Sequence, residues 1–293
     1  MPCRVRFTGS ALGLFKETLI GSILLIITVG FYAPWFICRV QRWFCSNTII
    51  KDRTGNEVSL QFRGAGEELF LTYLVGLVLT VLTLGVYGFW FAVKTHKFFL
   101  ENTSGQTSSG QQVTLSFDGE GGELFKEIFF GCLLTIVTFG IYTPWMMCSL
   151  FRFFTNRTSI QVGDSGYLSL SFQGSGGGLF VTFIIGYFLT IITLGIYGFW
   201  LQVKLIKFFH GNTEITTVSG NKLRLNFMGT GGELAWINIT GILLTILTLG
   251  LYGFWYMFQL IEFQSDNLEI TSDYIITPAG VEFKSSDLAS LLK

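Results

Sequence analysis

The segment LTIITLGIYGFW (189–200) ends in a glycine–aromatic pattern that decides the fold, because this pattern returns along the whole chain. Its tryptophans are always 55 residues apart, and an apolar stretch precedes each one. A fixed period of this length is typical of repeat proteins, whose units pack against their neighbours. The five copies are GFYAPW (30–35), GVYGFW (85–90), GIYTPW (140–145), GIYGFW (195–200) and GLYGFW (250–255).

The period divides the chain into repeats that form one continuous membrane domain. Copies one and three carry a proline in the pattern (Pro34, Pro144), whereas copies two and four carry Gly-Phe, so a larger repeat of 110 residues is superimposed. The expected units are 1–55, 56–110, 111–165, 166–220 and 221–275, followed by a C-terminal strand and tail at 276–293.

Composition points to a membrane. Half of the 293 residues are hydrophobic and only 13% are charged, against about 25% in ordinary globular domains. This excludes a disordered chain or a coiled coil and disfavours a soluble enzyme. The 19 basic and 19 acidic residues give no net attraction to nucleic acid. Five cysteines, an odd number without a CxxC pair, argue against a disulfide framework.

Each repeat combines a short strand with a long apolar run. Alternating segments such as VTLSF (113–117) lead through a glycine-rich corner into an uncharged run of at least 21 residues. About 20 apolar residues suffice for a helix to cross the hydrocarbon core. We therefore expect an α-helical multi-pass membrane protein with short β-strands and hairpins between its helical units. The runs are 18–38, 69–93, 128–151, 179–203 and 234–261.

Two topologies remain open. In the first, each repeat crosses the membrane once. In the second, each repeat enters, breaks at the Gly-x-Tyr turn and returns, with Gly85 and its equivalents ending the first helix. The second is favoured, because it places all basic flanks and linkers on the cytoplasmic side, as the positive-inside rule requires, and lets the strands build one sheet.

The glycine run GEGGEL (119–124) has two interpretations. Glycines between a strand and a helix can hold a phosphate at the helix N-terminus. The favoured alternative is a sharp corner, since Glu123 in the first helical turn would repel a phosphate.

A stripe of small residues follows the apolar runs at spacings of four and three, which places it on one helix face. We expect it to pack helices, with a ring of pore-lining hydroxyls as the alternative. The candidates are Gly76, Thr80, Thr83, Gly131, Thr135, Thr138, Gly186, Thr190, Thr193, Gly241, Thr245 and Thr248.

Aromatic and basic residues flank the runs. Tyrosine and tryptophan are typical of membrane interfaces, so the expected interface anchors are Tyr32, Trp35, Tyr87, Trp90, Tyr142, Trp145, Tyr197, Trp200, Tyr252 and Trp255. The basic residues form a positive flank and are candidates for lipid head groups; they are Arg39, Arg42, Lys94, Lys97, Arg152, Lys204 and Lys207.

The sequence contains no candidate catalytic or metal-binding residues. His96 and His210 lack acidic or cysteine partners at ligand spacing, and there is no serine–histidine–aspartate set. We expect no enzyme activity, no metal and no cofactor.

The phrase LLTILTLGLYGFW (243–255), together with VKLIKFFHGNT (203–213) and FDGEGGELF (117–125), resembles the YjgN-type family of bacterial inner-membrane proteins. The resemblance covers all five repeats and implies a multi-pass inner-membrane protein. The family is one of unknown function, so it implies no catalytic residue. Pro34 and Pro144 depart from its pattern.

The expected function is a self-assembling membrane scaffold or a ring or pore module with a shared cytoplasmic β-layer. Its expected partners are membrane lipids and further copies of itself, joined through the terminal strands at Cys3–Phe7 and Tyr274–Phe283. A small-solute transporter or channel is the alternative. It is disfavoured because coupled transporters usually keep charged residues in the membrane centre.

Overall fold

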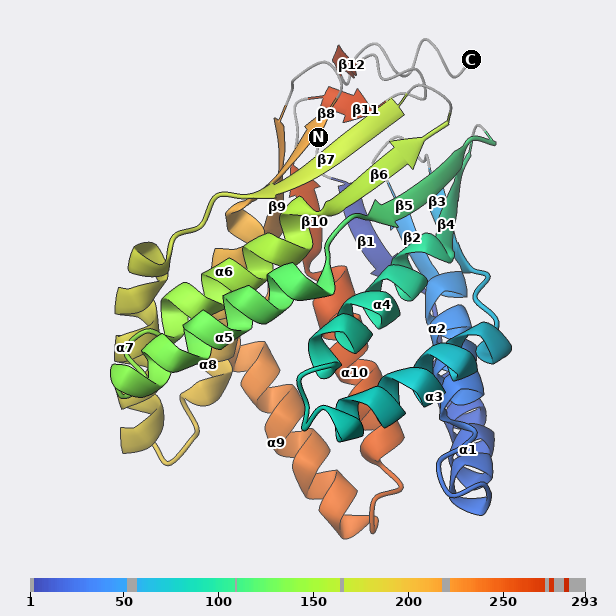
Figure 1. Ribbon diagram of the computed structural model, residues 1–293, viewed down its shortest axis with the longest axis horizontal. Helices are drawn as coiled ribbons and strands as arrows, with labels where there is room; N and C mark the ends of the chain where they lie inside the picture. Colours follow the sequence, from blue (N-terminus) through green and yellow to red (C-terminus); the bar gives the residue numbers. More distant parts are fainter. Residues whose placement is uncertain are drawn as a thin grey trace.

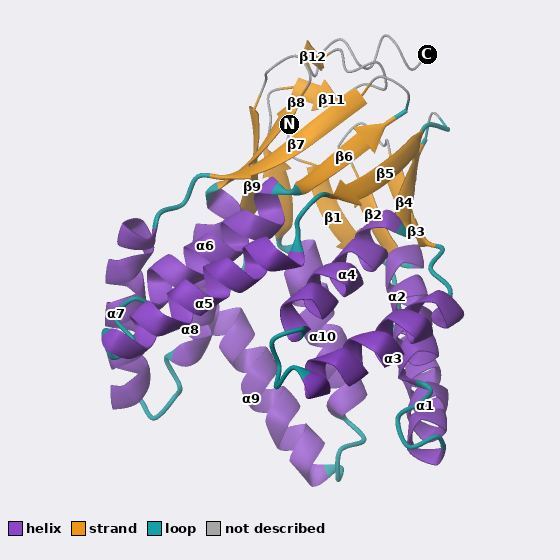
Figure 2. Ribbon diagram, viewed as in Figure 1, coloured by secondary structure: helices purple, strands orange, loops and turns teal. Residues whose placement is uncertain are grey.

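The computed structural model describes residues 3–51, 57–108, 110–163, 166–217, 222–271, 274–276 and 282–284. A β-barrel forms one end of the molecule, and helical hairpins extend from its base (Figures 1 and 2). Most of the tail expected at 276–293 lies outside the described residues.

Each repeat contributes a strand, two helices and a second strand. The barrel strands are β1 (Cys3–Phe7), β2 (Thr48–Lys51), β3 (Glu57–Phe62), β4 (Thr103–Thr107), β5 (Gln112–Phe117), β6 (Thr158–Val162), β7 (Gly166–Phe172), β8 (Thr213–Thr217), β9 (Lys222–Phe227) and β10 (Leu268–Thr271). The outgoing helices are α1 (Ala11–Ile27), α3 (Gly66–Leu82), α5 (Gly121–Val137), α7 (Gly176–Ile192) and α9 (Gly231–Leu247). The returning helices are α2 (Ala33–Ser46), α4 (Gly88–Glu101), α6 (Thr143–Asn156), α8 (Gly198–Gly211) and α10 (Gly253–Asp266).

The barrel closes within one chain. β1 pairs antiparallel with β2 on one side and with β10 on the other, where Arg4 lies opposite Glu269 and forms an ion pair of 2.5 Å. Closure removes the sheet edges that could pair with another molecule. We expected copies to join through the strand Cys3–Phe7, but both edges of this strand are already paired within its own barrel. Oligomerisation stays a prediction. β11 (Tyr274–Ile276) and β12 (Glu282–Lys284) form a separate two-stranded sheet.

The barrel is packed with apolar side chains. One buried cluster comprises Val162, Leu168, Ile215 and Leu223, and it extends to partly buried residues on β5 and β10, on opposite sides of the barrel. The outer face carries polar pairs, such as the two hydroxyls of Ser116 and Ser159 at 2.7 Å. Apolar residues thus fill the interior, whereas polar residues cover the outside.

The apolar runs do not form membrane-crossing helices, so the expected α-helical multi-pass fold is wrong. The run 69–93 is divided between α3 and α4, and none of the described helices combines the length and the hydrophobicity that a membrane crossing requires. The division lies at the Gly-x-Tyr turn, and the strands share one barrel, as the hairpin topology expected. Thr83, two residues before Gly85, is the residue that ends the first helix.

The five hairpins form a ring beneath the barrel. Each helix packs against the next in sequence, and α10 packs against α1. At this junction Phe15 stacks on Trp255, with ring centroids 5.5 Å apart, and meets Phe254 edge-on at 5.2 Å. The last repeat thus packs on the first, which completes a pseudo-symmetric ring of one chain.

Candidate functional site

The most unusual feature is the residue at the tip of each hairpin. It adopts a left-handed conformation with φ of 50–51° although it is bulky and apolar, a geometry that costs about 1–2 kcal/mol for a residue with a Cβ. These side chains are 87–96% exposed. They are Val29, Leu84, Phe139, Leu194 and Leu249. An apolar side chain is therefore held, at an energetic cost, where its own chain leaves it almost fully exposed.

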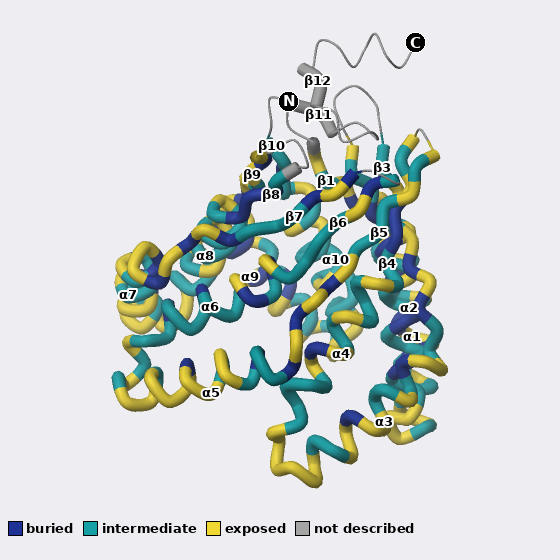
Figure 3. Tube along the Cα trace, turned by 45° about the horizontal axis from the view of Figure 1, so that its top comes forward, coloured by how far each residue is buried: buried dark blue, intermediate teal, exposed yellow. Residues whose placement is uncertain are grey.

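Exposed segments continue from the tips along the outgoing helices (Figure 3), and many of their exposed side chains are apolar. On α3 the exposed side chains recur at helical spacing through Leu74, Leu77, Val78 and Val81, and the other four outgoing helices show the same pattern. Monomeric soluble proteins rarely expose large continuous apolar patches, which mark contact with a membrane or another protein. The site is thus a surface made of five hairpins.

Every backbone N–H of the turn between α3 and α4 is paired inside its own hairpin. Those of Leu84 and Gly85 donate to the carbonyls of Val81 and Thr80, at 3.2 and 2.7 Å. The N–H of Tyr87 donates to the Thr83 hydroxyl at 2.8 Å. The same set of bonds recurs in the other four turns. The turn therefore needs no water to satisfy its donors.

The small-residue stripe lies between the two helices of each hairpin. A Cβ atom at Gly76 would overlap the ring of Phe91 on the returning helix. The equivalents are Gly131 under Met146, Gly186 under Leu201 and Gly241 under Tyr256. This placement favours helix packing over a row of groups lining a path.

The threonine hydroxyls bond to their own helix. Thr80 donates to the Gly76 carbonyl at 2.6 Å, and Thr83 donates to the Leu79 carbonyl at 2.7 Å. The same bonds are formed by Thr135, Thr138, Thr190, Thr193, Thr245 and Thr248. Sequence reasoning missed the second role of Thr83 and its equivalents, which accept the N–H of the tyrosine four residues later.

The tryptophans join neighbouring repeats. Trp145 lies against Gly176 of the next repeat, where a Cβ atom would come within 2.7 Å of the Trp145 Cα. The equivalents are Trp35 on Gly66, Trp90 on Gly121 and Trp200 on Gly231, while Trp255 stacks on Phe15. The tyrosine three residues before each tryptophan stacks on it; these are Tyr32, Tyr87, Tyr142, Tyr197 and Tyr252. The four glycines were not expected as contact residues, although their constant offset from the tryptophans could have indicated them.

The basic residues divide into three pairs, with Lys207 apart from them. Arg42 and Arg152 donate to the carbonyls of Gly64 and Gly174 at 3.1 and 2.7 Å, and so link consecutive repeats. Arg39 and Lys97 form ion pairs with Glu17 and Glu101, respectively. Lys94 and Lys204 bond to the hydroxyls of Tyr87 and Tyr197, at 3.0 and 2.8 Å. Lys207 is exposed.

The histidines have packing roles. His96 meets Phe117 and Phe154 edge-on, with ring centroids 4.8 and 4.9 Å apart, and His210 Nδ1 lies 2.9 Å from the Ile206 carbonyl oxygen. Within the described residues there is no group of three or more histidine, cysteine, aspartate or glutamate side chains that could hold a metal.

These features define a class of tandem-repeat protein, in which one chain closes into a barrel and presents a ring of apolar hairpins. A model of a family described as bacterial protein of unknown function (DUF898) matches residues 2–54, 57–109, 112–169 and 167–219. The chain belongs to this family, which confirms the resemblance seen in the sequence.

A curated relative is Inner membrane protein YjgN from Salmonella typhimurium, which is 32% identical over 84 residues. The match covers 28% of this chain and 20% of the relative, so the chain spans about a fifth of that protein's length. No solved structure matches.

Proposed function

We propose that the protein is a non-enzymatic membrane scaffold, whose five hairpins enter one leaflet of the bacterial inner membrane while its barrel stays in the cytoplasm. The hydrogen-bonded N–H groups of the hairpin turns carry this proposal. Irregular backbone exposed to lipid is not tolerated in the hydrocarbon core when its polar groups are unpaired, because water is absent there. The N–H groups of these turns are paired. The name of the Salmonella relative supports the inner membrane as the location.

The depth of insertion follows from the position of Lys94. It lies ten residues after Leu84 at the tip, which corresponds to about 15 Å at 1.5 Å per residue. Half of a hydrocarbon core of about 30 Å has the same thickness. With Lys94 at the level of the head groups, the hairpin tips reach the middle of the bilayer and stop there.

The barrel supports a scaffold rather than a channel. The buried cluster of Val162, Leu168, Ile215 and Leu223 fills part of its interior with apolar side chains, whereas a polar pair such as Ser116 with Ser159 on its outer face suits water. Because the ring of hairpins closes within one chain, a single inserted copy occupies a fixed area of one leaflet and excludes lipid from it. The basic flanks favour the cytoplasmic side for the barrel.

Labelling of single cysteines tests the topology in a variant that lacks the five native cysteines. Ser116→Cys on the barrel should react with a membrane-impermeant maleimide only after permeabilisation of the inner membrane. Leu194→Cys at a tip should stay unreactive from both sides, and a fluorophore attached there should be quenched by lipids with a spin label near the bilayer centre. Labelling of Leu194→Cys from the periplasm of intact cells would contradict insertion into one leaflet.

Glycine at the tips should change stability and membrane binding in opposite directions. In the triple variant Leu84→Gly, Leu194→Gly and Leu249→Gly, relief of the left-handed strain should raise the free energy of unfolding by about 1 kcal/mol per site. Loss of the side chains should weaken vesicle binding by roughly 2 kcal/mol per site. Both are measured on the purified protein, by thermal unfolding and by vesicle flotation.

The corresponding Leu→Met variants serve as the control, because methionine keeps both the strain and the apolar surface. Their stability and binding should stay close to those of the unmodified protein. Unchanged flotation of the glycine variant would remove the tips from the membrane contact.

A further inference from the structure

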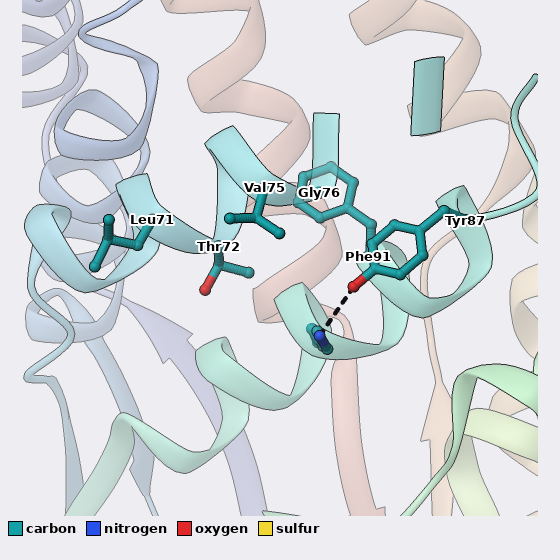
Figure 4. Close-up of a pocket in the computed structure, with 7 residues that line it drawn as sticks. Leu71, Thr72, Val75, Gly76, Tyr87 and Phe91 are labelled. Atoms are coloured by element: carbon teal, nitrogen blue, oxygen red, sulfur yellow. Dashed lines mark hydrogen bonds between the residues drawn. The ribbon is translucent and has the colours of Figure 1, made fainter. Parts of the chain in front are cut away.

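The second hairpin carries a groove that combines apolar walls with a cation, and the fourth hairpin has similar residues at the equivalent positions. In the second hairpin the groove encloses about 260 Å³ between α3 and α4 (Figure 4). Its apolar walls are Leu71, Val75 and Phe91, and Lys94 lies at one end. Lys94 bonds to the Tyr87 hydroxyl, and its ammonium nitrogen lies 5.6 Å from the centre of that ring.

No carboxylate in the described part of the chain neutralises the charge of Lys94. Within the described residues, no carboxylate lies at ion-pair distance from Lys94 or Lys204. An ammonium group has three donors, and the printed hydrogen bond of Lys94 to Tyr87 uses one. Two donors remain for an anion.

The first and third repeats show which group contacts the residue at the position equivalent to Lys94. Glu17 and Glu127 stand in place of Thr72 and Thr182. Glu17 forms an ion pair with Arg39, which replaces Lys94. Glu127 accepts a hydrogen bond from Ser149 at the same position. In the first and third repeats the chain thus places its own carboxylate beside this position, whereas the second and fourth repeats keep the cation and lack the acid.

The fourth repeat keeps the chemistry of the second. Lys204 bonds to the Tyr197 hydroxyl and lies 5.4 Å from the centre of its ring. The residues at the equivalent positions are Val181, Thr182, Ile185, Gly186, Tyr197, Leu201 and Lys204. In the fifth repeat Gln259 replaces the lysine, so no charge is present there.

We propose that the groove of the second hairpin and the equivalent residues of the fourth bind anionic phospholipids, with the phosphate on Lys94 or Lys204 and an acyl chain along the apolar wall. The proposal rests on the membrane insertion proposed above and names the lipid class that two of the five hairpins select. The missing carboxylate gives the charge complementarity, and the adjoining apolar wall favours a lipid over a free phosphate.

Native mass spectrometry of the full chain, released from membranes that contain phosphatidylglycerol and phosphatidylcholine, tests the proposal. The unmodified protein should retain phosphatidylglycerol. The double variant Lys94→Gln and Lys204→Gln should retain about fivefold less per site, the ratio expected for one lysine near an anionic surface. The double variant Thr72→Glu and Thr182→Glu introduces the acid of the first repeat while both lysines remain. It should show a similar loss of phosphatidylglycerol.

Two controls separate the groove from general positive charge. Lys97→Gln with Lys207→Gln removes the same charge one turn further along the same helices and should retain phosphatidylglycerol. Gln106→Glu with Gln161→Glu adds two acids at exposed barrel positions and should retain it as well. Equal losses in test and control variants would overturn the proposal.

Inorganic phosphate tests the source of the anion. If the ligand is a lipid, phosphate added to the protein in detergent should not displace bound phosphatidylglycerol; displacement that depends on Lys94 and Lys204 would assign both sites to a free anion. Flotation with vesicles of phosphatidylcholine alone reports the insertion itself. Flotation without selective phosphatidylglycerol retention refutes the lipid sites only, whereas absence of flotation refutes the proposed function.

Discussion

Gly176→Ala should destabilise the protein strongly, whereas Gly177→Ala, one residue later in the same helix, should stabilise it. A Cβ atom at Gly176 would meet the ring of Trp145 and come within 2.7 Å of its Cα, a backbone atom that no change of rotamer can move. At Gly177 nothing lies within 4 Å. Overpacking costs about 1–3 kcal/mol, whereas replacement of a helical glycine by alanine gains roughly 0.5–1 kcal/mol.

The pair is compared by thermal unfolding of the full chain in one detergent. The same contrast should appear between Gly231→Ala and Gly232→Ala, because Gly231 lies against Trp200 and Gly232 is open. Similar shifts within each pair would show that the tryptophan contacts do not hold neighbouring repeats together.

The repeat period predicted much of the architecture. The strand expected at 113–117 is β5 with one additional residue, and the break at the Gly-x-Tyr turn lies where the hairpin topology required it. Both depend on local signals, namely alternation along a strand and glycine at a turn, which are legible in a single sequence.

The membrane-spanning helices were predicted wrongly because the hydrophobicity of a segment indicates an apolar environment, but it does not indicate whether the chain turns within that segment. The tip residues Leu84 and Phe139 are apolar, so the apolar run in the sequence continues across the turn where the chain reverses direction. Barrel closure was also missed. The pairing of β1 with β10 joins the two ends of the ring, and no local pattern encodes contact across that separation.

The tryptophan contacts were missed for a related reason. Tyrosine and tryptophan beside an apolar run are expected at a membrane interface, whereas Trp145 lies on Gly176 of the following repeat. The glycine run GEGGEL (119–124) was interpreted as a corner. Its Gly121 is a contact residue that lies against Trp90, and only the structure distinguishes it from Gly122.

Thr83→Val should expel the tip of the second hairpin from the hydrocarbon core. Valine has the shape of threonine but offers no acceptor, so the Tyr87 N–H, now 2.8 Å from the Thr83 hydroxyl, would lose its partner. An unpaired amide costs several kcal/mol in hydrocarbon, whereas in water the solvent replaces the bond. The loss should therefore appear as a shallower tip in the bilayer, with the barrel still folded.

Three variants on one helix isolate this bond. Thr83→Ser keeps the acceptor and should leave the depth unchanged. Thr80→Val removes a hydroxyl that donates only to the Gly76 carbonyl, at 2.6 Å, so it leaves no amide unpaired and should also have no effect. Depth is measured by quenching a fluorophore at Leu84→Cys with spin-labelled lipids. If Thr83→Val and Thr80→Val gave equal quenching, the hydroxyl would have no part in keeping the turn in lipid, and the argument for insertion into one leaflet would lose its main support.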